Sequence, residues 1–322
     1  MKIGVVGVGA LGGYYGGRLC HAGIEVHLLL RTDYDVVREH GLCVQSADGD
    51  FTVHPHAHNI PDSIGICDLV LVGLKTTANS QYHELIDPLV GPNTAILCLQ
   101  NGLGNCEQLA ALFGKDQILA GLCFVCLNRT APGVVKHQGF GKIVLGEFQR
   151  ASQSRTREIA EKFEGAGVPC EVVDELDAGL WEKLVWNIPF NGLGIAAAAG
   201  LSSLESGEPP EVVGQAWATD RLLGEEAWGL RIRELMQEII NVALAKDINL
   251  KSNLSELMIQ NTRSMGAYRS STVIDFDKGR PFELESMFLE PLRQARAVKV
   301  PVPRLEGLCV VLKKLARYLP RS

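Results

Sequence analysis

A run of glycines near the start of the chain restricts its fold more than any other feature. Residues Gly7–Gly12 have the spacing G-x-G-x-x-G, directly after the β-branched run Lys2–Val6 and at the start of a helical pattern, Leu11–His21. A second strand-like run, Glu25–Leu30, ends about 20 residues later. This order is typical of a βαβ unit that binds the pyrophosphate of a dinucleotide, and a glycine-rich turn without a ligand is the alternative.

Each glycine of the motif has its own task in this interpretation. Gly7 makes the tight turn, Gly9 lets the backbone approach the pyrophosphate, and Gly12 lets the helix pack closely on the strand. Ala10 and Leu11 then lie at the N-terminus of the helix, where the partial positive charge of the backbone attracts phosphate.

The first 175 residues alternate short apolar runs with segments of helical period, which predicts an α/β fold with a Rossmann-like doubly wound sheet. Asp48-Gly49 separates two alternating runs and predicts a β-hairpin. Further strands are expected at 68–74, 94–99, 118–125, 134–137, 143–146 and 170–173, and helices at 79–90, 107–113 and 155–164.

After Glu175 helical period dominates and strand signals almost disappear, so a domain boundary is expected there. Residues 1–175 are predicted to form a dinucleotide-binding Rossmann domain, and residues 176–322 an all-α domain. The segment Leu201–Gly229 is interpreted as a loop followed by an acidic helix.

Charge and composition exclude several classes of partner. A net charge of −6 gives no long-range attraction to nucleic acid or to an anionic membrane, and no run of about 18 apolar residues is present to span a bilayer. Nine irregularly spaced cysteines favour a reducing, cytoplasmic location. Cys123 and Cys126 have C-x-x-C spacing, but a strand would point them to opposite faces, so core packing is favoured and no metal site is predicted.

Polar residues follow three expected strands on the side where a doubly wound sheet binds its ligand. Arg31 ends the second strand, where an NAD-binding chain has an acid for the ribose hydroxyls, and a guanidinium there suits the 2′-phosphate of NADP. Asp33, two residues later, keeps NAD as an alternative cofactor. A further alternative is that Arg31 is a solvent-exposed loop residue without a ligand. Lys75 and Asn101 follow two later strands and are expected to face the same crevice.

Three polar residues form a stripe on an otherwise apolar helical segment, Trp181–Gly192. Lys183, Asn187 and Asn191 are spaced by four, so they lie on one narrow face of the helix. A solvent-facing stripe is the alternative, although exposed stripes usually carry pairs of opposite charge. Pro189 is expected to bend the helix between the two amides.

Taken together, these features resemble the ketopantoate reductase family, the 2-dehydropantoate 2-reductases, over nearly the whole chain. The residues that carry the resemblance are the glycine motif, Lys75, Gln100-Asn101-Gly102, the Lys-x-x-x-Asn-x-x-x-Asn segment and a late motif formed by Ser271, Asp275, Arg280 and Glu283. The resemblance implies NADPH-dependent reduction of 2-dehydropantoate (ketopantoate) to pantoate, as in pantothenate biosynthesis.

The resemblance implies that residues 1–175 bind NADP and that residues 176–322 bind substrate and carry the catalytic groups. It also implies roles for individual residues. Lys183 is the general acid and Glu283 its hydrogen-bonding partner near the substrate hydroxyl and the cofactor. Substrate contacts fall to Asn101, Asn187, Asn191 and Ser271, and cofactor contacts to Gly7, Gly9, Ala10, Leu11, Gly12, Arg31, Lys75, Asn101 and Glu283.

Two positions depart from the family pattern in the half that would bind substrate. The threonine that usually precedes the late glutamate is Phe282, and the following aspartate is Glu285. These departures leave a reductase of another small 2-oxo acid as an alternative. A non-catalytic NADP-binding regulatory protein is a separate alternative, and the presence of both Lys183 and Glu283 speaks against it. The apolar C-terminal helices also allow a homodimer interface.

Overall fold

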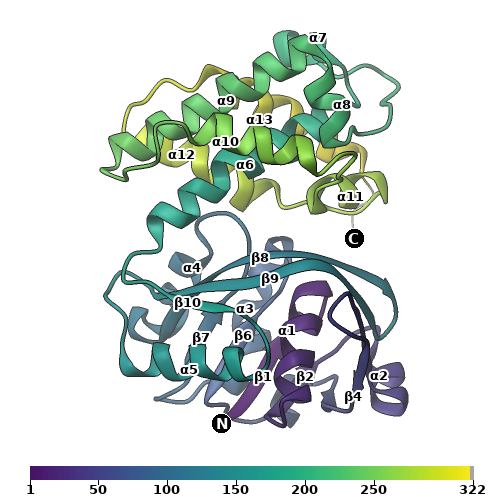
Figure 1. Ribbon diagram of the computed structural model, residues 1–322, viewed down its shortest axis with the longest axis vertical. Helices are drawn as coiled ribbons and strands as arrows, with labels where there is room; N and C mark the ends of the chain where they lie inside the picture. Colours follow the sequence, from purple (N-terminus) through teal and green to yellow (C-terminus); the bar gives the residue numbers. More distant parts are fainter. Residues whose placement is uncertain (320–322) are drawn as a thin grey trace. The chain divides into compact units, whose positions relative to one another are not determined.

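The computed structural model describes residues 1–319 and forms two compact units, Met1–Leu176 and a second that begins at Asp177 (Figure 1). The boundary expected from the sequence follows Glu175. The last three residues of the expected second domain, 320–322, lie outside the described residues.

The described part of the first unit holds a ten-stranded sheet with the order β4-β3-β9-β8-β7-β6-β1-β2-β5, in which β10 also pairs with β9. The strands β5, β2, β1, β6, β7 and β8 form one parallel series, whereas β8–β9 and β3–β4 are antiparallel. Their bounds are β1 Lys2–Val6, β2 Glu25–Leu29, β3 Leu42–Ser46, β4 Phe51–Val53, β5 His56–His58, β6 Leu69–Val72, β7 Ala95–Cys98, β8 Ile118–Ala131, β9 Val134–Glu147 and β10 Cys170–Val172.

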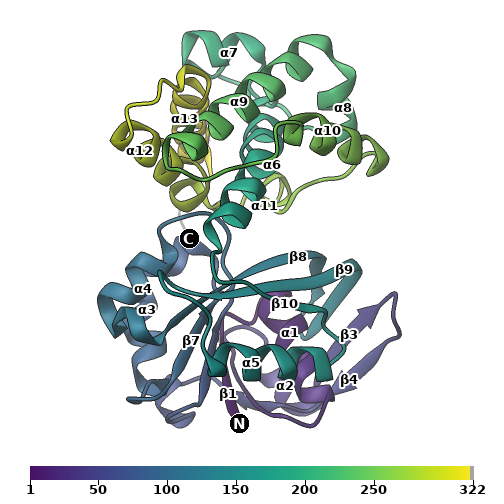
Figure 2. The same ribbon diagram turned by 60° about the vertical axis from the view of Figure 1, so that its left-hand side comes forward.

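Helices cover both faces of this sheet (Figure 2). Val5 of β1 belongs to a core that includes Tyr15 of α1 and Phe163 of α5, whereas the next residue, Val6, belongs to a core with Tyr82 of α3 and Leu109 of α4. Successive strand residues point to opposite faces, so each strand feeds two cores. The predicted doubly wound α/β architecture is therefore confirmed. The helices run α1 Ala10–His21, α2 Tyr34–His40, α3 Tyr82–Ile86, α4 Asn105–Phe113 and α5 Ser154–Gly165.

The three short strands expected between residues 118 and 146 are confirmed as strand, but their lengths are wrong: the first extends to Ala131 as β8, and the other two are one continuous strand, β9, which forms a long hairpin with β8. Its pairing shifts register at three places, Phe124/Val125, Cys126/Leu127 and Arg129/Ala131. Phe140, flanked by two glycines, has a φ of 64°. Such bulges interrupt the alternation of apolar and polar residues along a strand but do not end its pairing. In the sequence, the interrupted alternation therefore resembles a loop between two strands.

Several smaller elements also differ from expectation. The helix α2 and the strand β5 were not predicted, and the expected helix at 79–90 is instead a 3₁₀ turn η2 (Thr76–Gln81), then α3, then a second 3₁₀ turn η3 (Asp87–Leu89). Pro88 is the second residue of this last turn, and a proline cannot donate the backbone hydrogen bond that a continuing α-helix needs. The hairpin of β3 and β4 is confirmed, with its loop at residues 47–50.

The second unit is helical, and its described residues contain no strand, which confirms the predicted all-α half of the fold. The long helix α6 packs against α9, α11 and α13. No helix in the described chain combines the length and hydropathy needed to cross a bilayer. The helices run α6 Asp177–Ala196, α7 Leu201–Ser206, α8 Thr219–Gly224, α9 Glu226–Ala245, α10 Leu254–Ser264, α11 Ser271–Asp277, α12 Glu290–Ala297 and α13 Pro303–Leu315, with a π-helical turn, η5, at Glu285–Leu289.

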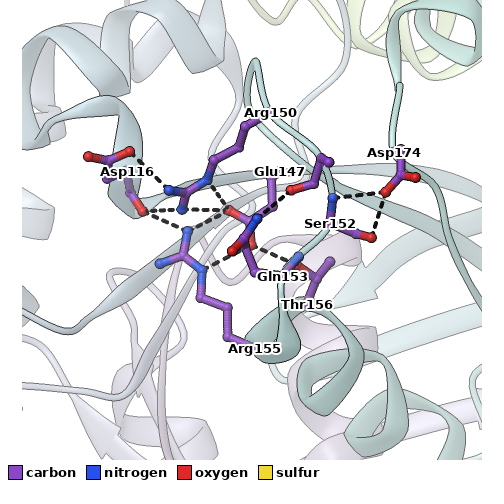
Figure 3. A network of polar contacts seen from close by, with 9 residues as sticks. Asp116, Glu147, Arg150, Ser152, Gln153, Arg155, Thr156 and Asp174 are labelled. Atoms are coloured by element: carbon purple, nitrogen blue, oxygen red, sulfur yellow. Dashed lines mark hydrogen bonds and ion pairs between the residues drawn. The ribbon is translucent and has the colours of Figure 1, made fainter.

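A polar network joins the end of β9 to the start of α5 (Figure 3). The fully buried carboxylate of Glu147 accepts hydrogen bonds from Arg150, Arg155 and Thr156, and both arginines also contact Asp116. Burial alone raises the pKa of Glu147, but these hydrogen bonds outweigh it and hold the pKa below its ordinary value. The carboxylate therefore fixes the connection that leads from the sheet into α5.

Candidate active site

The turn between β1 and α1 requires glycine at two positions for separate reasons. Gly7 has a φ of +92°, and a Cβ on it would lie 2.6 Å from the carbonyl carbon of Gly73. A Cβ on Gly12 would overlap the carbonyl oxygen of Gly7 and lie 3.1 Å from Val5 Cγ1, so this glycine lets the helix lie against the strand. Both glycines are required by the folded chain itself.

Gly9 differs, because apart from its two chain neighbours nothing in the described chain lies within 4 Å of where its Cβ would be. It is the N-cap of α1, and among the described residues no side chain caps this helix. The N–H groups of Ala10, Leu11 and Gly12 precede the first intrahelical hydrogen bond, which runs from Gly13 N to Gly9 O at 3.0 Å. Open space beside uncapped donors is the arrangement that a pyrophosphate needs.

At the end of β2 the two candidate polar residues lie in opposite environments. Arg31 is exposed, whereas Asp33 is only 5% exposed. Asp33 Oδ2 accepts hydrogen bonds from Arg129 Nε at 2.7 Å and Gly133 N at 3.0 Å, and Oδ1 accepts from Arg129 Nη2 and from Thr32 Oγ1. Burial raises the pKa of Asp33, but these donors outweigh it and the net pKa is lowered.

Gln100 joins the ends of β6 and β7. Its Nε2 donates to Leu74 O and to Asn79 Oδ1, both at 3.0 Å, and its Oε1 accepts from the hydroxyl of Tyr82. Lys75 follows β6 after Gly73 and Leu74 and is exposed. Gln100 is therefore bound into the fold and fixes the backbone on which the neighbouring polar residues lie.

Asn101 follows Gln100 and is half-buried. Its carbonyl oxygen accepts a hydrogen bond from Asn105 Nδ2 at 2.9 Å, which ties it to the start of α4. The structure thus places Asn101 and Lys75 after neighbouring parallel strands of one sheet.

The polar stripe of α6 does not face solvent. Asn187 is 9% and Asn191 is 2% exposed, and Lys183 is half-buried. Asn191 Nδ2 donates to Asn187 O at 2.8 Å, while Asn191 Oδ1 is buried and has no partner among the described residues. A buried acceptor without a donor is costly, which makes this atom a candidate ligand contact. The helix continues through Pro189.

Glycines let two later segments approach α6. A Cβ on Gly192 would lie 2.8 Å from Phe288 Cε1 in the π-helical turn, and one on Gly194 would lie 2.6 Å from Val273 Cγ2 in α11. Glu283 is 3% exposed and lies just before this turn, and Met287 N donates to its carbonyl oxygen at 3.2 Å. π-helical turns are frequent at functional sites.

Ser271 is the first residue of α11 and is exposed. Its neighbours Ser270 and Thr272 are buried, and their hydroxyl oxygens have no hydrogen-bond partner in the described chain. Ser270 and Thr272 were not predicted from the sequence as site residues. Their position on either side of Ser271, the serine of the late motif, is the sequence feature that could have identified them.

The candidate residues are thus divided between the two units. The glycine motif, Arg31, Lys75 and Asn101 belong to the first, and Lys183, Asn187, Asn191, Ser271 and Glu283 belong to the second. Arg129 was not predicted from the sequence, and it lies 96 positions from its partner Asp33. No local pattern predicts a pair so distant along the chain.

Comparison with known proteins places this chain in a family. The family model of ketopantoate reductase PanE/ApbA matches residues 3–150, and that of its C-terminal part matches residues 175–316. A 2-dehydropantoate 2-reductase of Nostoc sp. is 37% identical over 98% of this chain and 95% of its own length.

Solved structures agree over the same extent. A 2-dehydropantoate 2-reductase from Geobacter metallireducens superposes with a TM-score of 0.88 at 42% identity, covering 98% of this chain and 99% of that one. D-mandelate dehydrogenase, solved with NADH and anilino(oxo)acetate, has a TM-score of 0.83 over 99% of both chains, and at 20% identity this likeness shows the fold alone. The match of both family models and of these near full-length relatives shows that the chain belongs to the ketopantoate reductase family.

Proposed function

We propose that this protein is an NADPH-dependent 2-dehydropantoate 2-reductase, which reduces the 2-oxo group of 2-dehydropantoate to give pantoate. The observation that carries the proposal is the contrast within the glycine motif, where Gly7 and Gly12 serve the fold and Gly9 opens onto free space beside the uncapped start of α1. The Nostoc and Geobacter relatives bear the name of this activity.

The residues of the first unit suit a nicotinamide dinucleotide. In the proposal the N–H groups of Ala10, Leu11 and Gly12 bind the pyrophosphate, and Arg31 with Lys75 binds the adenosine 2′-phosphate. The cofactor supplies the hydride when it is bound. Asn101 follows the strand next to that of Lys75 and contacts cofactor and substrate.

The residues of the second unit supply the proton and orient the oxo acid. As the ketone oxygen gains negative charge, the Lys183 ammonium stabilises it and then donates a proton to it. Asn187 and Asn191 hold the substrate, and Ser271 contacts its carboxylate. Glu283 accepts a hydrogen bond near the substrate hydroxyl and positions Lys183.

The two departures from the family pattern take part in the fold. Phe282 is buried, and its ring lies 6.3 Å from that of Phe276. Glu285 is exposed and forms an ion pair with Arg293. Neither contact depends on a ligand, so both substitutions have a structural explanation.

A panel of 2-oxo acids, assayed by the loss of NADPH absorbance, tests the proposal. We expect 2-dehydropantoate to give the highest kcat/KM. A higher value with another small 2-oxo acid would identify a reductase of that acid. Binding of NADPH without turnover of any acid would instead favour the regulatory alternative.

We expect Gly9→Ala to weaken NADPH binding about tenfold or more while lowering the free energy of unfolding by less than about 1 kcal/mol. The added methyl group meets nothing in the folded chain, but it occupies the space proposed for the pyrophosphate. Titration by NADPH fluorescence and urea denaturation measure the two effects. Gly165→Ala, at the open end of α5, is the matched control. Unchanged NADPH affinity would contradict the proposed site.

Arg31→Ala is expected to remove most of the preference for NADPH over NADH, because a charge-assisted contact with a phosphate changes affinity by about 10- to 100-fold. Calorimetric titration of both cofactors gives the ratio of their dissociation constants. Arg38→Ala, an exposed arginine of α2, makes the same change in net charge. If Arg31→Ala keeps the original ratio, another residue binds the 2′-phosphate.

A further inference from the structure

We propose that Arg129 is a positioning residue for cofactor choice, which occupies the carboxylate of Asp33 and so prevents it from binding the adenosine ribose. Arg31 then stays as the charged group beside the end of β2 that can bind a 2′-phosphate. This inference rests on the proposed NADPH dependence. It explains how a chain with an acidic residue near the end of β2 can prefer NADPH to NADH.

The acceptor capacity of Asp33 is already used. A carboxylate has about four lone-pair sites, and Asp33 accepts four hydrogen bonds, two on each oxygen. Two come from the planar fork of Arg129, one from Thr32 Oγ1 and one from Gly133 N. No lone pair is left for a pair of ribose hydroxyls, and the positive charge of Arg129 offsets the negative charge of Asp33.

The short segment that carries Arg31 is fixed at both ends. On one side, Leu30 N donates to His58 O of β5 at 2.7 Å. On the other side, the Asp33 side chain is held by Arg129, and Val37 N donates to the Asp33 carbonyl oxygen at 2.9 Å. Arg31 therefore projects from a restrained backbone, which lowers the entropy lost when its guanidinium orders on a phosphate.

The long hairpin explains how Arg129 reaches Asp33. Arg129 lies near the end of β8, at a shift of register, and Gly133 follows in the hairpin turn with a φ of +67°. Gly133 O accepts a hydrogen bond from Cys43 N at 2.9 Å, so the tip is tied to β3. The tip thus brings two donor residues, Arg129 and Gly133, to Asp33 from about 100 residues away along the chain.

The experiment compares binding of 2′,5′-ADP and 5′-AMP by calorimetry, since these fragments differ in the 2′-phosphate and need no turnover. The variants are Arg129→Met, Asp33→Asn and the double substitution. In Arg129→Met the released carboxylate repels the phosphate and accepts hydrogen bonds from the ribose, so the preference for 2′,5′-ADP is expected to fall about tenfold or more. In the double variant that carboxylate is gone, and the preference returns to near the wild-type value.

Asp33→Asn alone replaces one acceptor oxygen by an NH2 donor and removes the negative charge that Arg129 offsets, so its informative readout is the affinity for 5′-AMP, which has the ribose hydroxyls but no 2′-phosphate. Because Asp33 does not bind the ribose in the wild type, the affinity of Asp33→Asn for 5′-AMP is expected to stay within about threefold of the wild-type value. A large loss of affinity for 5′-AMP would show that the carboxylate already binds the ribose, and would overturn the inference.

Two further results would also overturn it. The first is a preference for 2′,5′-ADP over 5′-AMP in Arg129→Met that equals that of the wild type. The second is a preference in the double variant that stays as low as in Arg129→Met, because Arg129 would then act through the hairpin and not through Asp33. A wild-type protein that binds both fragments equally would contradict the proposed NADPH preference. The change of ratio between wild type and Arg129→Met would still decide the role of Arg129.

Discussion

Lys183→Ala is expected to lower kcat by about 10²–10⁴-fold and to leave the affinity for NADPH nearly unchanged. Lys183 is half-buried on the second helical turn of α6, in a unit separate from the glycine motif. Its proposed proton reaches the substrate oxygen as the hydride arrives, so its loss affects the transition state far more than the bound cofactor. Single-turnover kinetics and a fluorescence titration of NADPH measure the two quantities separately.

Glu182→Ala provides the control, because the neighbouring glutamate is exposed on the same helix. Its kcat is expected to stay within about twofold of wild type. Near-normal turnover in Lys183→Ala would assign the general acid to another residue. A loss of NADPH affinity as large as the loss of kcat would instead show that Lys183 serves to bind the nucleotide.

Glu147→Ala is expected to lower the free energy of unfolding by about 3 kcal/mol at neutral pH. The buried carboxylate accepts hydrogen bonds from Arg155 Nε at 3.0 Å, Arg150 Nε at 3.1 Å and Thr156 Oγ1 at 2.6 Å. Removing it leaves two arginines and a buried hydroxyl without their shared acceptor. Urea denaturation measures the change, with Glu158→Ala on the exposed face of α5 as control.

The same substitution has a defined pH dependence. The pKa of Glu147 is lowered in the folded chain, so the unfolded chain binds the proton more readily. Its stabilising contribution is therefore complete above the ordinary glutamate pKa of about 4.3 and is lost as pH falls through the lower folded value. The difference in stability between wild type and Glu147→Ala should narrow below about pH 4. A difference that stays constant from neutral pH to pH 3 would contradict this account.

Those features of the fold that depend on local spacing could be predicted from the sequence. The glycine motif predicts the turn between β1 and α1, because a Cβ on Gly7 or Gly12 would collide with atoms of the same βαβ unit or of the segment after β6. The spacing of Lys183, Asn187 and Asn191 predicts their common face because a helix repeats every 3.6 residues. Their burial follows from the apolar residues on either side.

The remaining features depend on contacts between distant parts of the chain. The strand β5 contains only His56–His58, and it exists because β2 offers a free edge to pair with. The residue type of Asp33 suggested a contact with the ribose of a cofactor. In the structure, its carboxylate instead accepts hydrogen bonds from Arg129 and Gly133 at the hairpin tip. Tertiary partners of this kind leave no periodic signal in the sequence.

The free edges of the described sheet also affect how this protein behaves when concentrated. The outermost strands, β4, β5 and β10, are each three residues long. A short edge offers few unpaired backbone groups to a strand from another molecule, so it is a poor template for intermolecular β-pairing. The fourteen-residue strands β8 and β9 lie inside the strand order, but β7 pairs only with Ile118–Ala120 of β8, so no strand of the described sheet covers the second edge of the rest of β8. Intermolecular β-pairing is therefore disfavoured at the three short outer strands, and the uncovered length of β8, interrupted by its register shifts, is the edge from which it would begin.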